Sequence, residues 1–468
     1  MPKVTVYIPA YNYGRFLNAA LQSVLKQTMD DWELIVIDDG STDDTTQILA
    51  SYRMHPKIRI LKQENRGLNF TNNMVLRIAK GEYFMRLDAD DFLDENILLV
   101  LSQVLDMKPD VDLVYPDYYL VNEDGEITEI IRRQKIGEEV DLLDLPAHGA
   151  CTMIRKQVLW EIGGYFEEFS CQDGYGMWLK FIERHRPYNV NVPLFYYRRH
   201  EESLSKSRGL ILETRRKIKR RVVEEMNLSH KPKVLALVPA FLDSGFAFGD
   251  PFRQFMGKSL LERTLEQIME ARSIDKAVVS SNDEDLLAFA NRFQGVDVLI
   301  MPQAPAKWAV RMEDTSLHVL QTLKERGYIP DAVCVCCVNT PLRGGVHIDK
   351  AVDTMTIFNV DSVISITEDF SFYYHHGKHG LTPVNGSLQR TLRLERKALF
   401  KDNGAIYLNR VDTVLAGKFL GERIGHITML PEESVRIDSE YDFWLAEKIA
   451  TEWIQTAPSD KIADVQTP

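Results

Sequence analysis

The stretch VTVYIPAYN, residues 4–12, runs from an apolar strand into a turn that begins at Pro9 and Ala10. Two further apolar runs end in polar turns, IDDGSTDD at residues 37–44 and RLDADD at residues 86–91. Strands that alternate with amphipathic helical segments, as here, predict a mostly parallel sheet with helices on both faces. Ligands of such sheets bind beyond the carboxyl ends of the strands. The three turns therefore mark a candidate ligand site.

The same alternation starts again near residue 233, with apolar runs at residues 234–240, 276–281 and 297–302. A chain of 468 residues is also too long for one ordinary hydrophobic core. We therefore predict the α/β fold class, with two tandem Rossmann-like three-layer α/β/α domains joined by a basic helical linker. The expected bounds are residues 1–207 for the first domain, 208–232 for the linker, 233–456 for the second domain and 457–468 for a tail.

Charge and hydropathy exclude several classes of protein. A net charge of −12 argues against a nucleic-acid partner, because phosphate backbones need a basic face. No apolar run reaches the roughly 18 to 20 residues of a membrane span, and the chain does not start with a signal-peptide pattern. We expect a cytoplasmic protein, and a homo-oligomer is left open.

Six of the seven residues 215–221 are Lys or Arg, which predicts a solvated linker helix. The alternative interpretation is a patch that contacts anionic lipid or polysaccharide, with residues 215–221 at the inner membrane face.

Asp88 and Asp90 follow an apolar strand and lie two positions apart, so a tight turn can direct both carboxylates toward one cation. Oxygen ligands favour Mg²⁺ or Mn²⁺ as the cofactor. The alternative is a solvated acidic loop in which Asp91 and Asp94 cap the next helix.

Asp39, at the second strand end, can accept a hydrogen bond from a base N–H or a ribose hydroxyl. Tyr11 can stack on a nucleobase, with ordinary loop packing as the alternative.

Residues 4–207 resemble the family 2 glycosyltransferases, which have the GT-A fold, on the stretches IPAYN, IDDGSTDDT, NRGLNFTNN, AKGEYFMRLDADD, GGYFEEFSCQDGYGMWLKF and FYYRRHEESLS. The resemblance implies an inverting, metal-dependent transfer of a sugar, with Asp173 as the catalytic base; the alternative role of Asp173 is the N-cap of a helix starting near Tyr175. It implies nucleotide contacts from Pro9, Ala10, Tyr11, Asp39, Arg66 and Asp88, metal contacts from Asp88, Asp90 and His200, and leaving-group contacts from Arg198 and Arg199. Gly176 departs from the family pattern, in which Asp often stands at that position.

The donor implied is a nucleotide-sugar, with UDP-sugars favoured, and the acceptor is a glycan, a lipid-linked molecule or a protein. Bacterial surface-glycan synthesis or flagellar glycosylation is the suspected setting.

The second half resembles CMP-sugar synthetases of the acylneuraminate cytidylyltransferase type, on stretches such as GKSLLERTLEQ, NTPLR, DNGAIYLNR and SVRIDSEYDFWLAE. Phe241, Met301 and Arg436 stand where that family carries phosphate-binding or metal-binding residues, so we expect a degenerate domain that serves recognition or assembly. The resemblance leaves a sugar-binding wall and one residual acid: Asn339, Arg343, Asn403, Ala405, Tyr407 and Asp438.

Two alternatives compete with this interpretation. One is a bifunctional enzyme that makes a CMP-sugar and also transfers a sugar. The other is a non-catalytic scaffold that binds nucleotide-sugars. Two smaller patterns are interpreted as structural: the cysteines of VCVCCV, residues 333–338, as buried small side chains, and His375, His376 and His379 as a solvated loop.

Overall fold

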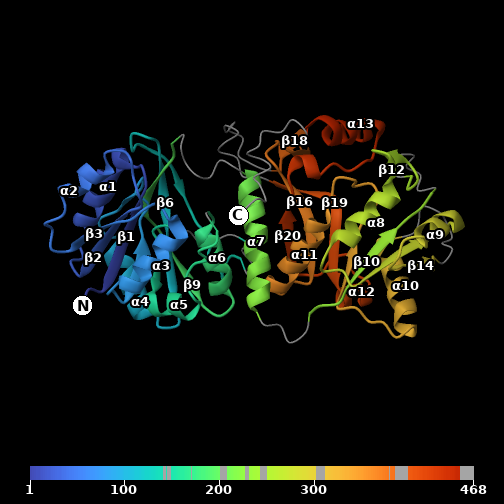
Figure 1. Ribbon diagram of the computed structural model, residues 1–468, viewed down its shortest axis with the longest axis horizontal. Helices are drawn as coiled ribbons and strands as arrows, with labels where there is room; N and C mark the ends of the chain where they lie inside the picture. Colours follow the sequence, from blue (N-terminus) through green and yellow to red (C-terminus); the bar gives the residue numbers. More distant parts are fainter. Residues whose placement is uncertain are drawn as a thin grey trace. The chain divides into compact units, whose positions relative to one another are not determined.

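The computed structural model describes residues 1–140, 144, 149–169, 171–200, 208–226, 231–242, 250–301, 311–378, 380–384 and 399–453. By the contacts between Cα atoms the chain forms two compact units, Met1–Val222 and Val223–Pro468 (Figure 1). Both units have the α/β architecture that the alternation of strands and helices predicts.

Among the described residues of the first unit, nine strands form one sheet in the order β3-β2-β1-β4-β8-β6-β9-β5, with β7 paired to β6. Strands β1 to β4 are mutually parallel, whereas β8 runs antiparallel to both β4 and β6. The strands are β1 (Val4–Ala10), β2 (Trp32–Asp38), β3 (Ile58–Lys62), β4 (Tyr83–Arg86), β5 (Phe92–Leu93), β6 (Leu113–Val121), β7 (Ile127–Ile131), β8 (Met153–Arg155) and β9 (Pro187–Arg198).

The helices of the first unit are α1 (Gly14–Leu25), α2 (Thr45–Ala50), α3 (Leu68–Ile78), α4 (Ile97–Met107), α5 (Lys156–Glu161), α6 (Asp173–Ile182) and α7 (Arg208–Glu225). Helix α1 forms because its apolar residues recur at helical spacing, and this face is buried on the sheet. The chain passes from β1 through α1 to β2 and then returns through α3 to β4, on the other side of β1. Right-handed crossovers therefore place α1 and α3 on opposite faces of the sheet.

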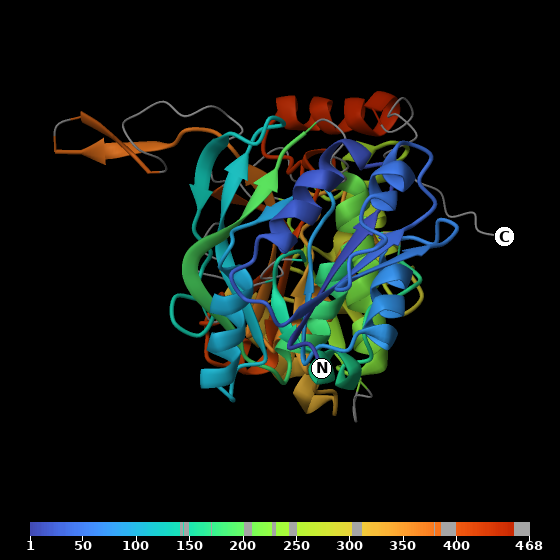
Figure 2. The same ribbon diagram turned by 90° about the vertical axis from the view of Figure 1, so that its left-hand side faces the viewer.

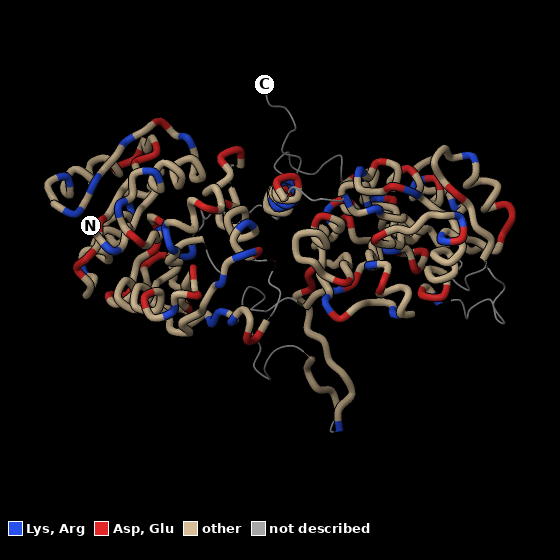
Figure 3. Tube along the Cα trace, turned by 90° about the horizontal axis from the view of Figure 1, so that it is seen from below, with Lys and Arg blue, Asp and Glu red and all other residues tan. Residues whose placement is uncertain are grey.

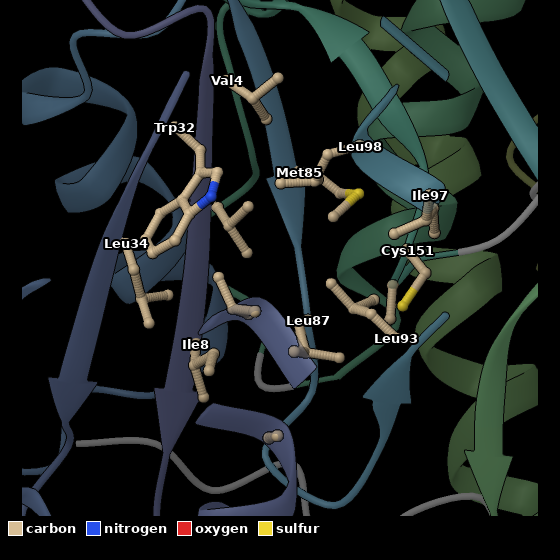
Figure 4. Close-up of a cluster of buried hydrophobic side chains, with 14 of the residues drawn as sticks. Val4, Ile8, Trp32, Leu34, Met85, Leu87, Leu93, Ile97, Leu98 and Cys151 are labelled. Carbon is tan, nitrogen blue, oxygen red and sulfur yellow. The ribbon is translucent and has the colours of Figure 1, made fainter. Parts of the chain in front are cut away.

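A cluster of buried apolar side chains binds the parallel strands to the helices of the first unit (Figure 4). Val4 and Ile8 come from β1, Leu34 from β2 and Met85 from β4, and each is fully buried. Leu87, just beyond β4, is also fully buried. Because β4 and the residue after it are anchored in this core, the polar turn that follows them has a fixed starting point.

Among the described residues of the second unit, seven strands form a sheet in the order β14-β13-β10-β15-β19-β16-β20. Strands β10, β13, β14 and β15 are parallel, and β19 runs antiparallel between β15 and β16. The strands of this sheet are β10 (Val234–Pro239), β13 (Lys276–Ser281), β14 (Val296–Ile300), β15 (Ala332–Val335), β16 (Ser362–Asp369), β19 (Leu399–Arg410) and β20 (Ile424–Thr428).

Helices cover both faces of the second sheet. Helices α8 and α11 contact each other on one face, whereas α10 and α12 contact each other over a core of side chains from β10, β13 and β15. The helices are α8 (Leu260–Glu270), α9 (Glu284–Ala290), α10 (Met312–Glu325), α11 (Gly345–Phe358), α12 (Val411–Leu415) and α13 (Glu440–Lys448), with a short 3₁₀ turn at Pro431–Glu433 and a π-helical turn at Ile449–Trp453.

Two small antiparallel hairpins complete the second unit. Strands β11 (Gln254–Phe255) and β12 (Lys258–Ser259) form one, and β17 (Tyr374–Gly377) and β18 (Gly380–Pro383) form the other, which extends away from the sheet (Figures 2 and 3). His375 and His376 lie in β17 and are exposed, so they belong to a strand rather than to the loop that we expected; His379 lies outside the described residues.

Strand β15 is shorter than the sequence predicts, since it ends at Val335 and leaves Cys336 and Cys337 in the following turn. The prediction of buried cysteines is confirmed for Cys334 and Cys336, whose Sγ atoms lie 3.8 Å apart. Cys337 is half-buried.

The basic segment predicted as a linker is helix α7, and all of it up to Val222 belongs to the first compact unit. Basic and acidic residues are interspersed along the chain in both units (Figure 3). In the part of the chain that the structure describes, no helix is both long enough and apolar enough to cross a bilayer.

Candidate active site

The turns after β1, β2 and β4 lie at one edge of the first sheet, because the three strands are parallel neighbours. Asn12 ties the first turn to the second, since its Oδ1 accepts a hydrogen bond from the backbone N of Thr42 at 2.8 Å. Pro9 and Ala10 end β1, and the side chain of Tyr11 just beyond them is 45% exposed. This exposure favours the predicted stacking on a base over the alternative of loop packing.

Asp39 organises the loop that carries Arg66. Its Oδ1 accepts hydrogen bonds from Gln63 Nε2 at 2.6 Å and from the backbone N of Arg66 at 2.9 Å, and its Oδ2 accepts one from the backbone N of Gly67 at 3.0 Å. The guanidinium of Arg66 then lies 3.6 Å above the centre of the Phe70 ring. A carboxylate has about four lone-pair positions, so Asp39 keeps one for a ribose or base donor.

Asp38, its neighbour, has a structural role. Its carboxylate accepts hydrogen bonds from the backbone N of Ser41 at 2.8 Å and from Thr46 Oγ1 at 2.9 Å. Burial alone would raise the pKa of Asp38, but these hydrogen bonds outweigh burial and hold the pKa below its ordinary value. Asp38 therefore closes the turn.

Asp90 and His200 are brought together from positions 110 residues apart. The Nε2 atom of His200 lies 3.0 Å from Oδ2 of Asp90, and the imidazole is fully buried. The rings of Tyr13 and Phe16 lie 5.5 Å and 5.2 Å from the imidazole and fix its orientation. Two of the three predicted metal contacts, Asp90 and His200, therefore lie together at the sheet edge.

The carboxylate of Asp88 interacts with the charges of Arg86, Asp90 and Asp173. Burial raises the pKa of Asp88 to about 6; the guanidinium of Arg86 opposes the rise, and the charges of Asp90 and Asp173 add to it. A cation bound beside carboxylates that repel one another in this way would reduce the repulsion.

Among the described residues, no three His, Cys, Asp or Glu side chains form a ready-made metal cage. Mg²⁺ usually binds through one or two carboxylates and completes its shell with water and substrate phosphates. The pair of carboxylates at Asp88 and Asp90, with His200 beside them, fits a cation of this kind that arrives with a diphosphate.

Arg86, the last residue of β4, joins the two predicted functional carboxylates. Its Nε atom lies 2.8 Å from Oδ1 of Asp88, and its Nη1 atom forms an ion pair with Oδ2 of Asp173. The side chain of Arg86 is 8% exposed and that of Asp173 is 11% exposed. Burial would lower the pKa of Arg86, but the charges of Asp173 and Asp88 outweigh it, so Arg86 stays a cation. A Cβ atom at Gly149 would lie 2.8 Å from Nη2 of Arg86, so a larger residue there would displace the end of this side chain.

A second contact orients Asp173 from α3. Tyr7 donates a hydrogen bond from its hydroxyl to Oδ1 of Asn72 at 2.9 Å, and Nδ2 of Asn72 donates one to Oδ2 of Asp173 at 3.2 Å. Burial raises the pKa of Tyr7 well above its ordinary value, so Tyr7 remains a neutral hydroxyl donor. The amide of Asn72 is therefore held with its NH₂ group toward the carboxylate.

Asp173 is the first residue of α6, and the N-cap is Gln172. The alternative that Asp173 serves as the helix cap is therefore wrong, and its carboxylate points into the Arg86 network instead. Sequence reasoning missed Arg86, Asn72 and Tyr7. The only signal was a charged residue, Arg86, at the end of an otherwise apolar strand.

Arg198 is used internally. Its Nε donates to the backbone O of Asp90 at 2.9 Å, its Nη1 donates to the backbone O of Glu123, and its side chain covers the rings of Phe16 and Phe92. The guanidinium of Arg198 is thus engaged by backbone carbonyls and aromatic rings of the first unit. Arg199 is exposed, so it is the better candidate for the predicted leaving-group contact.

The capping alternative for the acidic turn also differs from the structure. Asp91 is 1% exposed, and its Oδ1 accepts a hydrogen bond from the backbone N of Arg198 at 2.9 Å. Asp94 accepts one from the backbone N of Asn96, which is the N-cap of α4. Asp91 therefore fastens the end of β9 to the acidic turn instead of capping a helix.

In the second unit, the predicted sugar-binding wall is largely internal. Arg343 is 1% exposed and donates to the backbone O of Ala405 at 2.8 Å. Asn403 is 4% exposed, and its Oδ1 accepts from Ser365 Oγ at 2.6 Å. Tyr407 is 6% exposed. These side chains satisfy buried polar groups, because β19 runs through the centre of the sheet.

Asn339, Arg436 and Asp438 form the more open part of this region. The Nε of Arg436 donates to Oδ1 of Asp438 at 3.0 Å, and Nδ2 of Asn339 donates to the same oxygen at 3.3 Å. The carboxylate of Asp438, the residual acid, is therefore already paired with the guanidinium of Arg436. Met301 is buried against Thr315, and Phe241 precedes residues 243–249, which lie outside the described residues.

Comparisons with known proteins agree with the geometry of the first unit. Residues 5–163 match the family model "Glycosyl transferase family 2". Chondroitin synthase of Escherichia coli is 43% identical over 95 residues, which cover 20% of this chain and 14% of that protein. Glycosyltransferase GlyG of Streptococcus pneumoniae serotype 4 is 38% identical over 122 residues, which cover 26% of this chain and 40% of that protein.

Among solved structures, residues 1–349 of S. aureus TarS in complex with UDP-GlcNAc align at a TM-score of 0.42 with 20% identity, over 49% of this chain and 68% of that chain. The chain spans less than half the length of the two curated relatives. Residues 5–163 are thus similar to the glycosyltransferase domains of family 2.

Proposed function

We propose that the first unit transfers a sugar from a nucleotide-sugar donor to an acceptor hydroxyl, with inversion at the anomeric carbon. The observation that carries this proposal is the arrangement around Arg86, whose single buried guanidinium contacts both Asp88 and Asp173. A carboxylate for the diphosphate end of the donor and a carboxylate for the acceptor proton are thus fixed relative to each other. Such positioning of reacting groups supplies much of an enzyme's rate.

In the proposed reaction, Asp173 takes the proton of the acceptor hydroxyl as the new bond forms between its oxygen and the anomeric carbon. The bond from that carbon to the nucleoside diphosphate breaks in the same step, and the diphosphate leaves with the electron pair. Asn72 and Arg86 both bind Oδ2 of Asp173. Bound Mg²⁺ or Mn²⁺, held by Asp88, Asp90 and His200, would offset the charge of the departing diphosphate.

The donor contacts that we propose come from the sheet edge. Tyr11 stacks on the base, and Asp39 accepts from the base or the ribose. Arg66, Pro9 and Ala10 shape the same pocket, and Arg199 contacts the leaving group. A UDP-sugar is the favoured donor. A glycan is the favoured acceptor, because one similar protein is named as a chondroitin synthase; lipid-linked and protein acceptors remain the alternatives.

For the second unit we propose a role in recognition or assembly without nucleotidyl transfer. The support is the ion pair of Arg436 with Asp438, which places a cation where a metal would need a free carboxylate. The internal hydrogen bonds of Arg343 and Asn403 also support a role without nucleotidyl transfer. The resemblance to CMP-sugar synthetases remains a prediction.

A panel of UDP-, GDP-, dTDP- and CMP-sugars with Mn²⁺ tests the proposal. A bound donor raises the melting temperature of the chain by mass action. The donor that gives the largest shift is then used in a transfer assay with wild-type chain and with Asp173→Asn. Loss of transfer with an unchanged thermal shift supports the proposed base, and full activity of Asp173→Asn refutes it.

The same assay separates the alternatives. Release of pyrophosphate from CTP and a nonulosonic acid would show a bifunctional enzyme. Donor binding without hydrolysis or transfer, unchanged in Asp90→Asn, would show a non-catalytic scaffold.

A further inference from the structure

Helix α7 buries one stripe against the segment that carries Asp173. Thr214, Ile218 and Val222 recur at a spacing of four residues and are 7%, 1% and 6% exposed. A Cβ atom at Gly176 of α6 would lie 2.9 Å from the Phe166 ring and 3.7 Å from Cγ2 of Ile218. Gly176, the departure from the family pattern, therefore lies where Phe166 and α7 approach α6 closely.

Two buried charged or polar groups fasten the helix at the same place. Lys219 of α7 is 2% exposed, and its Nζ lies 2.6 Å from Oδ2 of Asp144. The other oxygen of Asp144 accepts a hydrogen bond from the hydroxyl of Tyr175 in α6, also at 2.6 Å. One carboxylate thus bridges α7 and α6. A buried, hydrogen-bonded ion pair of this kind has a fixed geometry.

The contacts continue into the residues just before Asp173. Arg215 donates from Nε to Oε1 of Gln172 at 2.7 Å, and its guanidinium lies 4.9 Å from the centre of the Tyr175 ring. The Sγ of Cys171 lies 3.4 Å from Oγ1 of Thr214. Both residues that precede Asp173 are therefore held by α7.

Gln172 needs such support because its backbone is in the left-handed region, with φ +61°. A residue other than glycine, Asn or Asp seldom adopts this conformation, because its Cβ atom crowds the backbone. The turn at Gln172 begins α6 and so sets the direction of the Asp173 side chain. If Gln172 relaxed to an ordinary backbone conformation, Asp173 would leave its place beside Arg86 and Asn72.

We propose that α7 is a positioning element of the active site, in which Arg215 holds Gln172 in its left-handed conformation and thereby aims the carboxylate of Asp173. This inference rests on the proposed role of Asp173 as the base. It gives a role within the first unit to part of the segment 215–221, for which the sequence predicts a solvated linker or a membrane-binding patch. Arg215, Lys219 and Arg221 of that segment contact Gln172, Asp144 and Glu168 of the first unit.

Three variants of the full chain test the proposal: Arg215→Ala, Gln172→Gly, and the two combined. Glycine adopts the left-handed conformation without strain. In the wild-type background, Arg215→Ala should lower kcat at least tenfold, with the donor KM unchanged within twofold. In the Gln172→Gly background, the same change at Arg215 should lower kcat less than threefold. The donor is the UDP-sugar that gives wild-type chain its highest rate.

Hydrogen exchange gives a readout that does not depend on activity. In Arg215→Ala, amides of residues 171–176 should exchange at least tenfold faster, whereas amides of α4 should be unchanged. Lys217→Ala is the matched control, because Lys217 lies on the same helix and is 46% exposed, with its Nζ 3.7 Å from Glu213. That variant should change neither exchange nor kcat.

Equal losses of kcat on Arg215→Ala in both backgrounds would overturn the proposal, and so would unchanged exchange at residues 171–176. If the amides of Arg215→Ala exchange faster throughout the first unit, the test is repeated with Arg215→Lys. Wild-type exchange and wild-type kcat in Arg215→Lys would also refute a specific role of the guanidinium. Wild-type chain without any transferase activity, or an active Asp173→Asn, refutes the proposed function itself. An inactive Asp173→Asn with a normal Arg215→Ala refutes only the role of α7.

Discussion

Replacement of Arg86 by methionine should destabilise the first unit by about 3 kcal/mol. The guanidinium contacts two carboxylates, and its side chain is 8% exposed. Removal of one partner of a buried ion pair costs about 3–5 kcal/mol, because the remaining charge is left unpaired. We take the lower end because Asp88 is 30% exposed, so that water screens part of its charge.

Urea unfolding of the full chain measures this change. Because the chain has two compact units, the unfolding of the first is read by pulse-labelling hydrogen exchange of peptides from residues 1–200. Arg77→Met is the matched control. Its Nη2 lies 3.3 Å from Glu167, and the two side chains are 56% and 38% exposed, so the cost should stay below about 1 kcal/mol.

A double variant tests the cause. Asp173→Asn removes the charge that Arg86→Met leaves unpaired, so the double variant should be at least about 1 kcal/mol more stable than Arg86→Met alone. Two results would refute the reasoning. One is a cost of Arg86→Met no larger than that of Arg77→Met, and the other is a double variant that is no more stable than Arg86→Met.

Three further outcomes are expected. Asp90→Asn should weaken binding of Mn²⁺ with UDP at least tenfold by titration calorimetry, whereas equal affinity would exclude Asp90 as a ligand. Burial would raise the pKa of Glu433, but hydrogen bonds from His347 and the Leu430 backbone hold this pKa below its ordinary value. The stability that results is present above about pH 4.3 and is lost as the pH falls further. Glu433→Gln should therefore flatten the acid side of a curve of unfolding free energy against pH. Asn403→Ala should destabilise the second unit by about 2–3 kcal/mol in a melting scan, because Ser365 and the Ala405 amide lose their acceptor, and should leave transfer unchanged.

Alternation of apolar strands and amphipathic helices was enough to predict the α/β class and the strand ends that carry Asp39 and Asp88. Those residues follow directly from local sequence, since a strand end and the turn after it are neighbours in the chain. The partners of Asp173 could not be predicted in the same way. Asn72 and Arg86 lie 101 and 87 residues before it, and only the sheet order brings α3, β4 and α6 together.

Residue type alone misled the interpretation where burial decides the role. Arg343 and Asn403 have the chemistry of sugar-binding residues, yet each is used to satisfy buried groups around β19. Arg198 likewise serves backbone carbonyls. The cations of residues 215–221 were visible in the sequence, but their acidic and amide partners lie far away in the chain, at positions 144, 168 and 172.

Helix α7 also affects where the chain could be cut to exchange the first unit for another domain. The family match ends at residue 163, and the motifs that carry the resemblance end by residue 207, yet the turn that aims Asp173 is held from residues 214–222. A domain swap cut at residue 207 would separate the proposed base, Asp173, from the helix that contacts the turn before it. A chimera joined after Glu225, the last residue of α7, would keep Asp173 together with the whole helix that contacts the turn before it.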